Sequence, residues 1–128
     1  MYTGYLISES FKNPEFLNKL NVKNVKVEYF KNAKGTGTSL KVWHLFKVGV
    51  SEKNIEKISK MISKKIKVSW YVHFYNKKKL YLILTDKIFV MPMEENFKSK
   101  EYQDAFKYSV TKGKVEKKYM FKKAKEII

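Results

Sequence analysis

Hydrophobic and polar residues alternate in two neighbouring segments of the chain, VKNVKVEYF at 22–30 and LKVWHLFKVGV at 40–50. A period of two is typical of a half-buried β-strand, in which successive side chains point to opposite faces of the sheet. We therefore predict an antiparallel hairpin closed by the glycine-containing loop at 31–39. The second strand is expected to place Val42, His44, Phe46, Val48 and Val50 on one face and Trp43, Leu45 and Lys47 on the other.

A second alternating region, SWYVHFYNKKKLYLILTDKIFV, runs from Ser69 to Val90. Its apolar runs are separated by NKKK and by Thr85–Lys87, which are typical turn compositions, so we predict a three-stranded meander. Pro92 should end it, because proline has no amide to donate to a ladder. We expect Trp70, Val72 and Phe74 to face inward beneath a helix, and Tyr71, His73 and Tyr75 to face the other way.

Helical spacing is clearest at 52–66, where isoleucine and methionine line one face and lysine the other; Ser51 is the predicted N-cap. The segment NPEFLNKL, with Asn13 as cap, predicts a short helix after a first strand, TGYLIS. A last helix is predicted from a cap at Ser99 and a stop at Gly113.

The order of elements is therefore strand, short helix, two strands, helix and strand, followed by further strands and a helix. We predict an α+β fold with a ferredoxin-like βαββαβ core and a mainly antiparallel sheet, extended by extra C-terminal strands and a helix. With 128 residues, the chain is expected to form a single domain spanning 1–128, with a basic C-terminal segment at 112–128.

These segments resemble a family of small bacterial proteins of uncharacterised function. The resembling stretches are MYTGYLISESF, VWHLFKV, WYVHFY, LYLILTDKIFV and YSVTKGKVEKKYMF, which together span nearly the whole chain. Because that family has no assigned activity, the resemblance implies no catalytic or binding residue for this sequence.

The net charge of +16 favours a negatively charged partner such as nucleic acid or an acidic protein. All 28 basic residues are lysine. Lysine is a point charge without the planar fork that arginine uses to read guanine, so contacts independent of base sequence are favoured over sequence-specific reading. A bias toward lysine also follows from AT-rich coding, so charge alone leaves the partner open.

Cysteine is absent, which excludes disulfides and thiolate metal sites and fits a reducing compartment. The N-terminal residues lack the pattern of a secretory signal, and no apolar run approaches the roughly 20 residues of a membrane helix. We expect a soluble cytoplasmic protein that does not bind membranes.

Exposed aromatic side chains on a sheet can stack nucleic-acid bases when lysines surround them. If one helix covers the inward face of the predicted meander, the tyrosines of its first strand lie on the other face. That face is expected to be either a contact surface or covered by the last helix or a second subunit; we favour the covered arrangement. The candidate nucleic-acid or partner surface comprises Trp43, Tyr71, Tyr75, Lys77, Lys78, Lys79, Lys117, Lys118, Lys122 and Lys123.

A second candidate site is a pocket at the end of the first strand, formed by Glu9, His44 and His73. A carboxylate hydrogen-bonded to an imidazole is a common acid–base pair, although structural roles for all three residues are the simpler expectation. Two histidines without a local pair do not make a zinc site, so no metal and no cofactor are expected.

Three classes of function remain open from the sequence. The favoured one is a non-catalytic binding module that contacts nucleic acid or an acidic protein without sequence specificity. The alternatives are an enzyme or small-ligand protein using the Glu9 pocket, and a module that self-associates as a homodimer.

Overall fold

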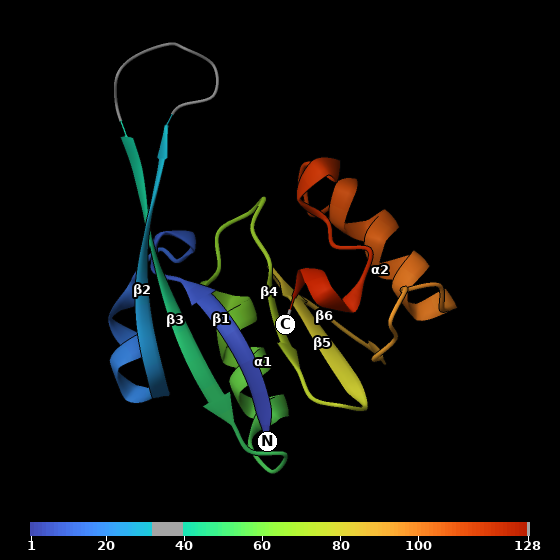
Figure 1. Cartoon of the computed structure of the whole chain (residues 1–128), viewed down its shortest axis with the longest axis horizontal. Coiled ribbons are helices and arrows are strands. Elements are labelled where there is room, and N and C mark those ends of the chain that lie inside the picture. Colours follow the sequence, from blue (N-terminus) through green and yellow to red (C-terminus); the bar gives the residue numbers. More distant parts are fainter. Residues whose placement is uncertain (32–39, 128) are drawn as a thin grey trace.

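The computed structural model describes residues 1–31 and 40–127, so the loop predicted at 31–39 lies outside the described residues except for Lys31. The protein is an α+β fold built on a six-stranded antiparallel sheet of order β2-β3-β1-β4-β5-β6 (Figure 1). The strands are β1 Tyr2–Ile7, β2 Asn21–Lys31, β3 Leu40–Val50, β4 Val72–Tyr75, β5 Lys79–Leu84 and β6 Lys87–Pro92. The two α-helices are α1 Ile55–Lys65 and α2 Lys100–Val110, and 3-10 turns occupy η1 Ser8–Ser10, η2 Pro14–Lys19, η3 Lys117–Tyr119 and η4 Ala124–Glu126.

The alternating segments form the strands predicted for them. β2 and β3 pair as an antiparallel hairpin, and a bulge between Val22 and Asn24 shifts their register. β3 also pairs with β1, from Tyr2 opposite Val50 to Ile7 opposite Leu45. β1 therefore lies between β3 and β4 and joins the hairpin to the meander.

Helix α1 forms from the isoleucine-rich stretch but begins later than predicted. Its first residue is Ile55 and its N-cap is Asn54, so the prediction that Ser51 caps the helix is wrong. The Ser51 carbonyl instead accepts a hydrogen bond from the Asn54 amide, which closes a turn before the helix starts. The other two predicted caps form: Asn13 accepts from the Glu15 amide, and Ser99 accepts from the Tyr102 amide.

One face of the sheet packs against α1 and η2, which lie behind the sheet in Figure 1. Ile55 and Ile62 of α1 and Leu17 of η2 are buried there against the strands. The strand residues of this first core are Tyr2, Leu6, Val48, Val50, Val72, Phe74, Tyr81 and Ile83.

Among residues 1–31 and 40–127, the second core covers the opposite face of the sheet over β4, β5 and β6. Helix α2, at the right in Figure 1, and the C-terminal segment, residues 112–127, form a second core with these strands. Its buried residues are Leu80, Leu82, Leu84, Met91, Phe97, Tyr102, Ala105, Val115, Met120, Phe121 and Ile127. Because β5 lies between the two cores, all of its residues except Lys79 are buried.

β4 is likewise covered on both faces, as the favoured arrangement predicted. Val72 and Phe74 are buried in the first core, whereas Tyr71 and Tyr75 pack against the second. Trp70 precedes β4, is half-buried and packs against the first core. Within the chain, the C-terminal segment and α2 contribute the residues of this second cover.

The second core stops at β4 and leaves the hairpin side of the same sheet face uncovered. Alternation places six side chains of β1 and β3 on this surface, which we call the open face. None of the six belongs to either core in the described part of the chain. They are Thr3, Tyr5, Ile7, Trp43, Leu45 and Lys47, all half-buried.

Within residues 1–31 and 40–127, the structure has no helix that combines the length and the apolar character needed to cross a membrane.

Candidate nucleic-acid interface

The open face is ordered in rows that cross the strands. In the central row Lys47 of β3 lies between Asn24 of β2 and Tyr5 of β1. In the next row Leu45 lies between Lys26 and Ile7. Directly opposed side chains in an antiparallel pair lie about 5 Å apart, so an aromatic ring and an ammonium group share the middle of this surface.

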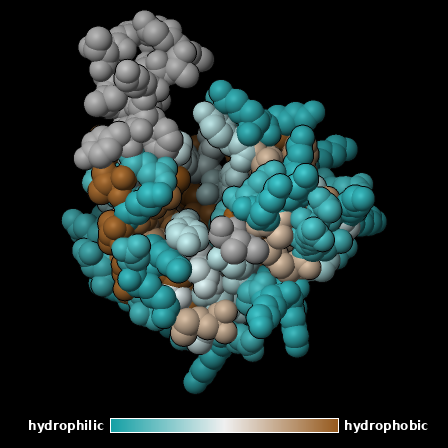
Figure 2. Space-filling view, viewed as in Figure 1, coloured by the Kyte–Doolittle hydropathy of each residue, from teal (hydrophilic) through white to brown (hydrophobic). Residues whose placement is uncertain are grey.

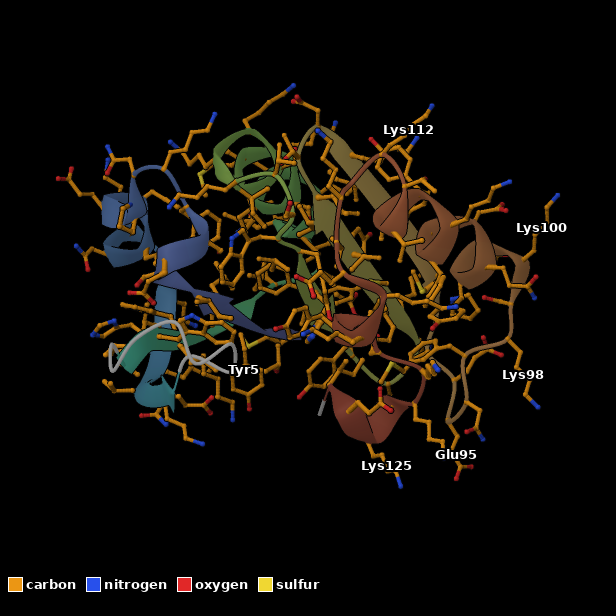
Figure 3. The ribbon with its side chains drawn as sticks, turned by 90° about the horizontal axis from the view of Figure 1, so that it is seen from above. Tyr5, Glu95, Lys98, Lys100, Lys112 and Lys125 are labelled. Atoms are coloured by element: carbon orange, nitrogen blue, oxygen red, sulfur yellow. The ribbon has the colours of Figure 1, made fainter. Side chains whose placement is uncertain are left out.

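Tyr5 projects from the sheet on the side of the C-terminal segment and away from α1 (Figure 3). Its neighbour toward β4 is Tyr75, which lies opposite Thr3. Burial, together with the proximity of Tyr5, raises the pKa of Tyr75. Tyr75 therefore marks the place where the open face meets the second core.

Tyr71 is less accessible than the sequence suggested. Its hydroxyl donates to the backbone carbonyl of Tyr119, and its ring centroid lies 6.2 Å from that of Phe121. Burial, with smaller contributions from Glu126 and Tyr102, raises the pKa of Tyr71 to about 12. Tyr71 thus anchors the C-terminal segment to the sheet.

Trp43 lies two residues beyond the end of the β1–β3 pairing. Its ring meets that of Trp70 edge to face at a centroid distance of 5.4 Å. The two tryptophans bring β3 together with the segment before β4, beyond the last paired residue of β1. Trp43 remains half-buried and extends the open face toward the outer end of the hairpin.

Two lysines outside the predicted contact surface lie on the open face. Lys47 occupies its central row, and the side chain of Lys23 lies over Gly49, where a Cβ would come within 2.6 Å of the lysine Cε. The alternation of 40–50 already places Lys47 on this face. The position of Lys23 depends on the bulge in β2, which no pattern in the sequence predicts.

The predicted lysines divide into two groups. Lys77, Lys78 and Lys79 are exposed at the β4–β5 turn, where the Asn76 side chain accepts from the amides of the last two at 2.8 Å. Two of the three line an open depression of about 710 Å³ beside Thr3 and Tyr75. Lys117, Lys118, Lys122 and Lys123 are exposed on the C-terminal segment.

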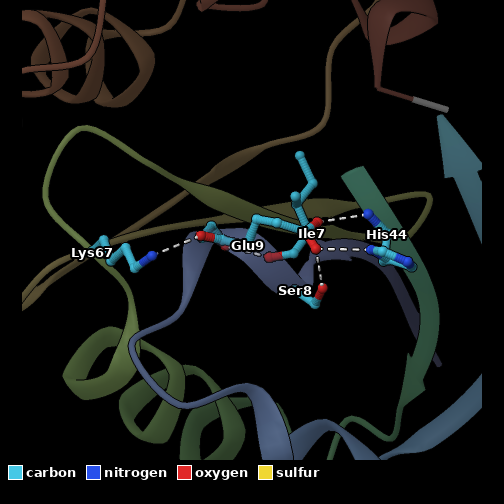
Figure 4. A network of polar contacts seen from close by, with 6 residues as sticks. Ile7, Ser8, Glu9, His44 and Lys67 are labelled. Atoms are coloured by element: carbon cyan, nitrogen blue, oxygen red, sulfur yellow. Dashed lines mark hydrogen bonds and ion pairs between the residues drawn. The ribbon is translucent and has the colours of Figure 1, made fainter. Parts of the chain in front are cut away.

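The structure brings together two of the three residues of the predicted pocket (Figure 4). Glu9 Oε2 lies 2.8 Å from His44 Nδ1, and Glu9 Oε1 accepts from the His44 amide at 2.6 Å. Ser8 Oγ donates to Glu9 Oε2 at 2.9 Å, and Lys67 Nζ donates to the Glu9 carbonyl at 3.1 Å. Both paired side chains are partly exposed, by 45% for the histidine and 36% for the glutamate.

The hydrogen bonds of this pair determine the protonation of Glu9. Burial alone would raise the pKa of Glu9, but the bonds from the His44 amide, the His44 ring and Ser8 outweigh it and hold the pKa below its ordinary value. Because an ionised carboxylate only accepts, Nδ1 of His44 carries the proton in this contact.

His73 lies away from this pair, on the sheet face covered by the C-terminal segment. Its ring centroid is 5.8 Å from that of Phe121 and 6.0 Å from that of Tyr71. Its Nδ1 is buried and has no hydrogen-bond partner among the described residues. Burial lowers the pKa of His73 to about 4, so its ring is neutral at physiological pH.

In the part of the chain that the structure describes, no three histidine or carboxylate side chains lie close enough together to hold a metal ion. Comparison of the chain with family models, with curated proteins and with solved structures finds no match. The function is therefore argued from the residues of this chain alone.

Proposed function

We propose that this protein is a non-catalytic binding module for a polyanion, with nucleic acid as the favoured partner and an acidic protein as the alternative. One observation carries the proposal: the half of a sheet face that neither core covers in the described residues presents Lys47 and Lys23 beside the half-buried aromatic rings of Tyr5 and Trp43. The net charge of +16 supports attraction of phosphates to this surface over several ångströms.

The composition favours binding without sequence preference. A lysine ammonium group neutralises a phosphate but does not make the bidentate contact by which arginine recognises guanine. Lysine contacts to the backbone position a nucleic acid without reading its bases. The proposed setting is the cytoplasm, which the absence of cysteine from the sequence favours.

The experiment is a salt titration of binding, monitored by fluorescence anisotropy of a labelled oligonucleotide of mixed sequence. The logarithm of affinity should fall linearly with the logarithm of salt concentration, by about 0.7 to 0.9 for each phosphate neutralised. An affinity that does not change with salt, or no binding at low salt, would contradict the proposal.

A double variant locates the binding surface. Lys23→Gln with Lys47→Gln should reduce affinity and flatten the salt dependence by about 0.7 to 0.9 for each phosphate that the variant no longer neutralises. The matched control is Lys57→Gln with Lys60→Gln, which removes the same charge from exposed positions of α1 on the other side of the sheet. Equal reductions in the two double variants would assign binding to total charge and not to the open face.

We also propose that the first four strands follow the ferredoxin-like βαββαβ order. The sheet order β2-β3-β1-β4, with α1 between β3 and β4, supports this assignment, and η2 occupies the position of the first helix. β5, β6 and α2 extend that core. The assignment is relevant to function because an uncovered sheet face is a known nucleic-acid platform on such folds.

The pair of Glu9 and His44 supports a second candidate, a small-ligand or enzymatic site. A carboxylate that orients an imidazole through Nδ1 directs Nε2 away from the pair, an arrangement suited to proton transfer with a ligand. A ligand that uses it should shift the His44 ring signals in NMR spectra, and His44→Gln should abolish its binding. Homodimer formation is the third candidate, and sedimentation that shows a monomer at high concentration would exclude it.

A further inference from the structure

We infer that the open face is a stacking platform for unpaired bases, so that the nucleic acid it takes is single-stranded, with Tyr5 and Trp43 as base-stacking residues and Lys47 and Lys23 as phosphate contacts. The inference rests on the proposed function and specifies its substrate class.

The arrangement of the open face fits a single strand. Tyr5 lies opposite Lys47, and Trp43 is four residues further along β3, which corresponds to about 13 Å of strand. Ile7 and Leu45 pair in the row between them and supply an apolar floor. Rings separated by an apolar floor offer flat surfaces to successive bases, and an ammonium group beside the first ring can meet the backbone.

The surroundings of the platform are concave and basic. Figure 2 shows the molecular surface hollowed between the β2–β3 hairpin and the lobe formed by α2 and the C-terminal segment. Lys26 is exposed at the hairpin edge, where it pairs with Glu28 at 3.2 Å. The opposite lobe carries the exposed lysines Lys117 and Lys122.

Single-stranded nucleic acid matches this chemistry better than the other occupants. A duplex keeps the faces of its bases inside the stack, so it could use the lysines but not the rings. A second copy of the chain docked through a two-fold axis would set this lysine-bearing face against the same face of its partner, which brings positive charges together. An acidic protein satisfies the charge but gives the half-buried rings no specific role.

The absence of arginine from the sequence also favours binding that does not depend on base sequence. Stacking is tolerant of sequence because every base has a π-face, and lysine contacts to phosphates carry no base information. The platform should therefore bind single strands of different sequence with similar affinity.

The experiment compares a labelled oligothymidylate with a mixed-sequence duplex of the same length in low salt. We expect tighter binding of the single strand. Tyr5→Leu should weaken single-strand binding by between about five-fold and about a hundred-fold, which is the range for removal of one stacked base, and should leave the salt dependence unchanged. Tyr5→Phe should retain the wild-type affinity. The matched control, Tyr119→Leu, removes a tyrosine that is 55% exposed outside the open face and should have no effect.

A measurement on the unaltered protein keeps the test decisive if Tyr5→Leu does not fold. Both tryptophans of the chain, Trp43 and Trp70, lie at the end of the platform, so a stacked base should quench their fluorescence. Heparin, a polyanion without bases, should bind in low salt with little quenching.

The outcomes separate the inference from the proposed function. Equal affinity for single strand and duplex, with steep salt dependence and no effect of Tyr5→Leu, overturns the stacking platform and leaves polyanion binding in place. Equal quenching by heparin and oligothymidylate also overturns the platform. Absence of binding to either nucleic acid in low salt overturns both the platform and nucleic acid as the partner. Binding to an acidic protein alone also overturns both.

Discussion

The ring of Phe74 on β4 lies directly against the backbone of Gly4 on β1, at one of the two residue pairs that join these strands. A Cβ added at Gly4 would lie 2.5 Å from Cδ1 of that ring and 2.8 Å from the carbonyl oxygen of His73. Phe74 is fully buried in the first core. The glycine therefore allows the hairpin half of the sheet to join the meander half.

We predict that Gly4→Ala lowers the free energy of unfolding by about 1 to 3 kcal/mol, because the added methyl group overpacks a buried ring and a backbone carbonyl. Chemical denaturation monitored by tryptophan fluorescence measures the change. The matched control is Gly49→Ala on β3, where the closest atoms are the ends of the flexible side chains of Lys23 and Met1. Gly49→Ala should change stability by less than about 0.5 kcal/mol. Similar destabilisation of the two variants would show that close packing of Phe74 is not the cause.

Helix α1 contains a buried hydroxyl without a partner. Ser59 is fully buried, and its Oγ makes no hydrogen bond to any described residue. We predict that Ser59→Ala raises the free energy of unfolding by about 0.5 to 1 kcal/mol, because alanine removes an unsatisfied polar group and is the better helix former. Thermal unfolding followed by circular dichroism should show a higher midpoint.

The neighbouring Ser63 on the same buried face provides the comparison. Its Oγ donates to the Lys60 carbonyl at 2.8 Å, so Ser63→Ala exchanges a hydrogen bond for the same gain in helix propensity. The Ser63→Ala variant should therefore be less stable than the Ser59→Ala variant. A larger gain at Ser63 than at Ser59 would contradict the assignment of an unsatisfied hydroxyl.

The strands and α1 were predictable because their signal is local. The period of two in β3 and the isoleucine spacing in α1 each follow from burial of one face of one element. The α+β class, the antiparallel sheet and two of the three helix caps could be inferred from these patterns. The start of α1 could not, because the sequence does not show that the Ser51 carbonyl closes a turn ahead of the helix.

The candidate site was less predictable because it depends on contacts between distant segments. Glu9 and His44 are 35 residues apart and meet because Ile7 pairs with Leu45 in the β1–β3 register. His73, like His44, has apolar neighbours in the sequence, but it lies on the face that the C-terminal segment covers. The extent of that cover, which distinguishes Tyr71 from Tyr5, is a property of tertiary packing that no single segment encodes.

His73 should make the protein less stable in acid. Its pKa is lowered from 6.5 to about 4 in the folded protein, so between these values the unfolded chain binds more protons than the folded one. The contribution of the neutral His73 ring to the free energy of unfolding is fully present above pH 6.5 and is lost as the pH falls toward 4. It amounts to about 3 kcal/mol. NMR titration of the His73 ring should give a midpoint near 4, and a midpoint near 6.5 would contradict its burial. In His73→Leu the acid-induced decrease in stability should be smaller by the same amount.

Glu9 is predicted to stabilise the fold through its contact with His44. Because hydrogen bonds hold its folded pKa below the unfolded value, the contribution is present above the unfolded pKa and is lost as the pH falls through the folded pKa. Glu9→Gln should therefore lower stability at neutral pH, by about 1 kcal/mol once partial solvent exposure is allowed for, and the difference from wild type should disappear in acid. The control is Glu15→Gln, which neutralises an exposed carboxylate in the nearby turn η2 and should have little effect at any pH. Denaturation curves at several pH values measure both variants. A destabilisation of Glu9→Gln that persists in acid would mean that the side chain acts through packing and not through its charge.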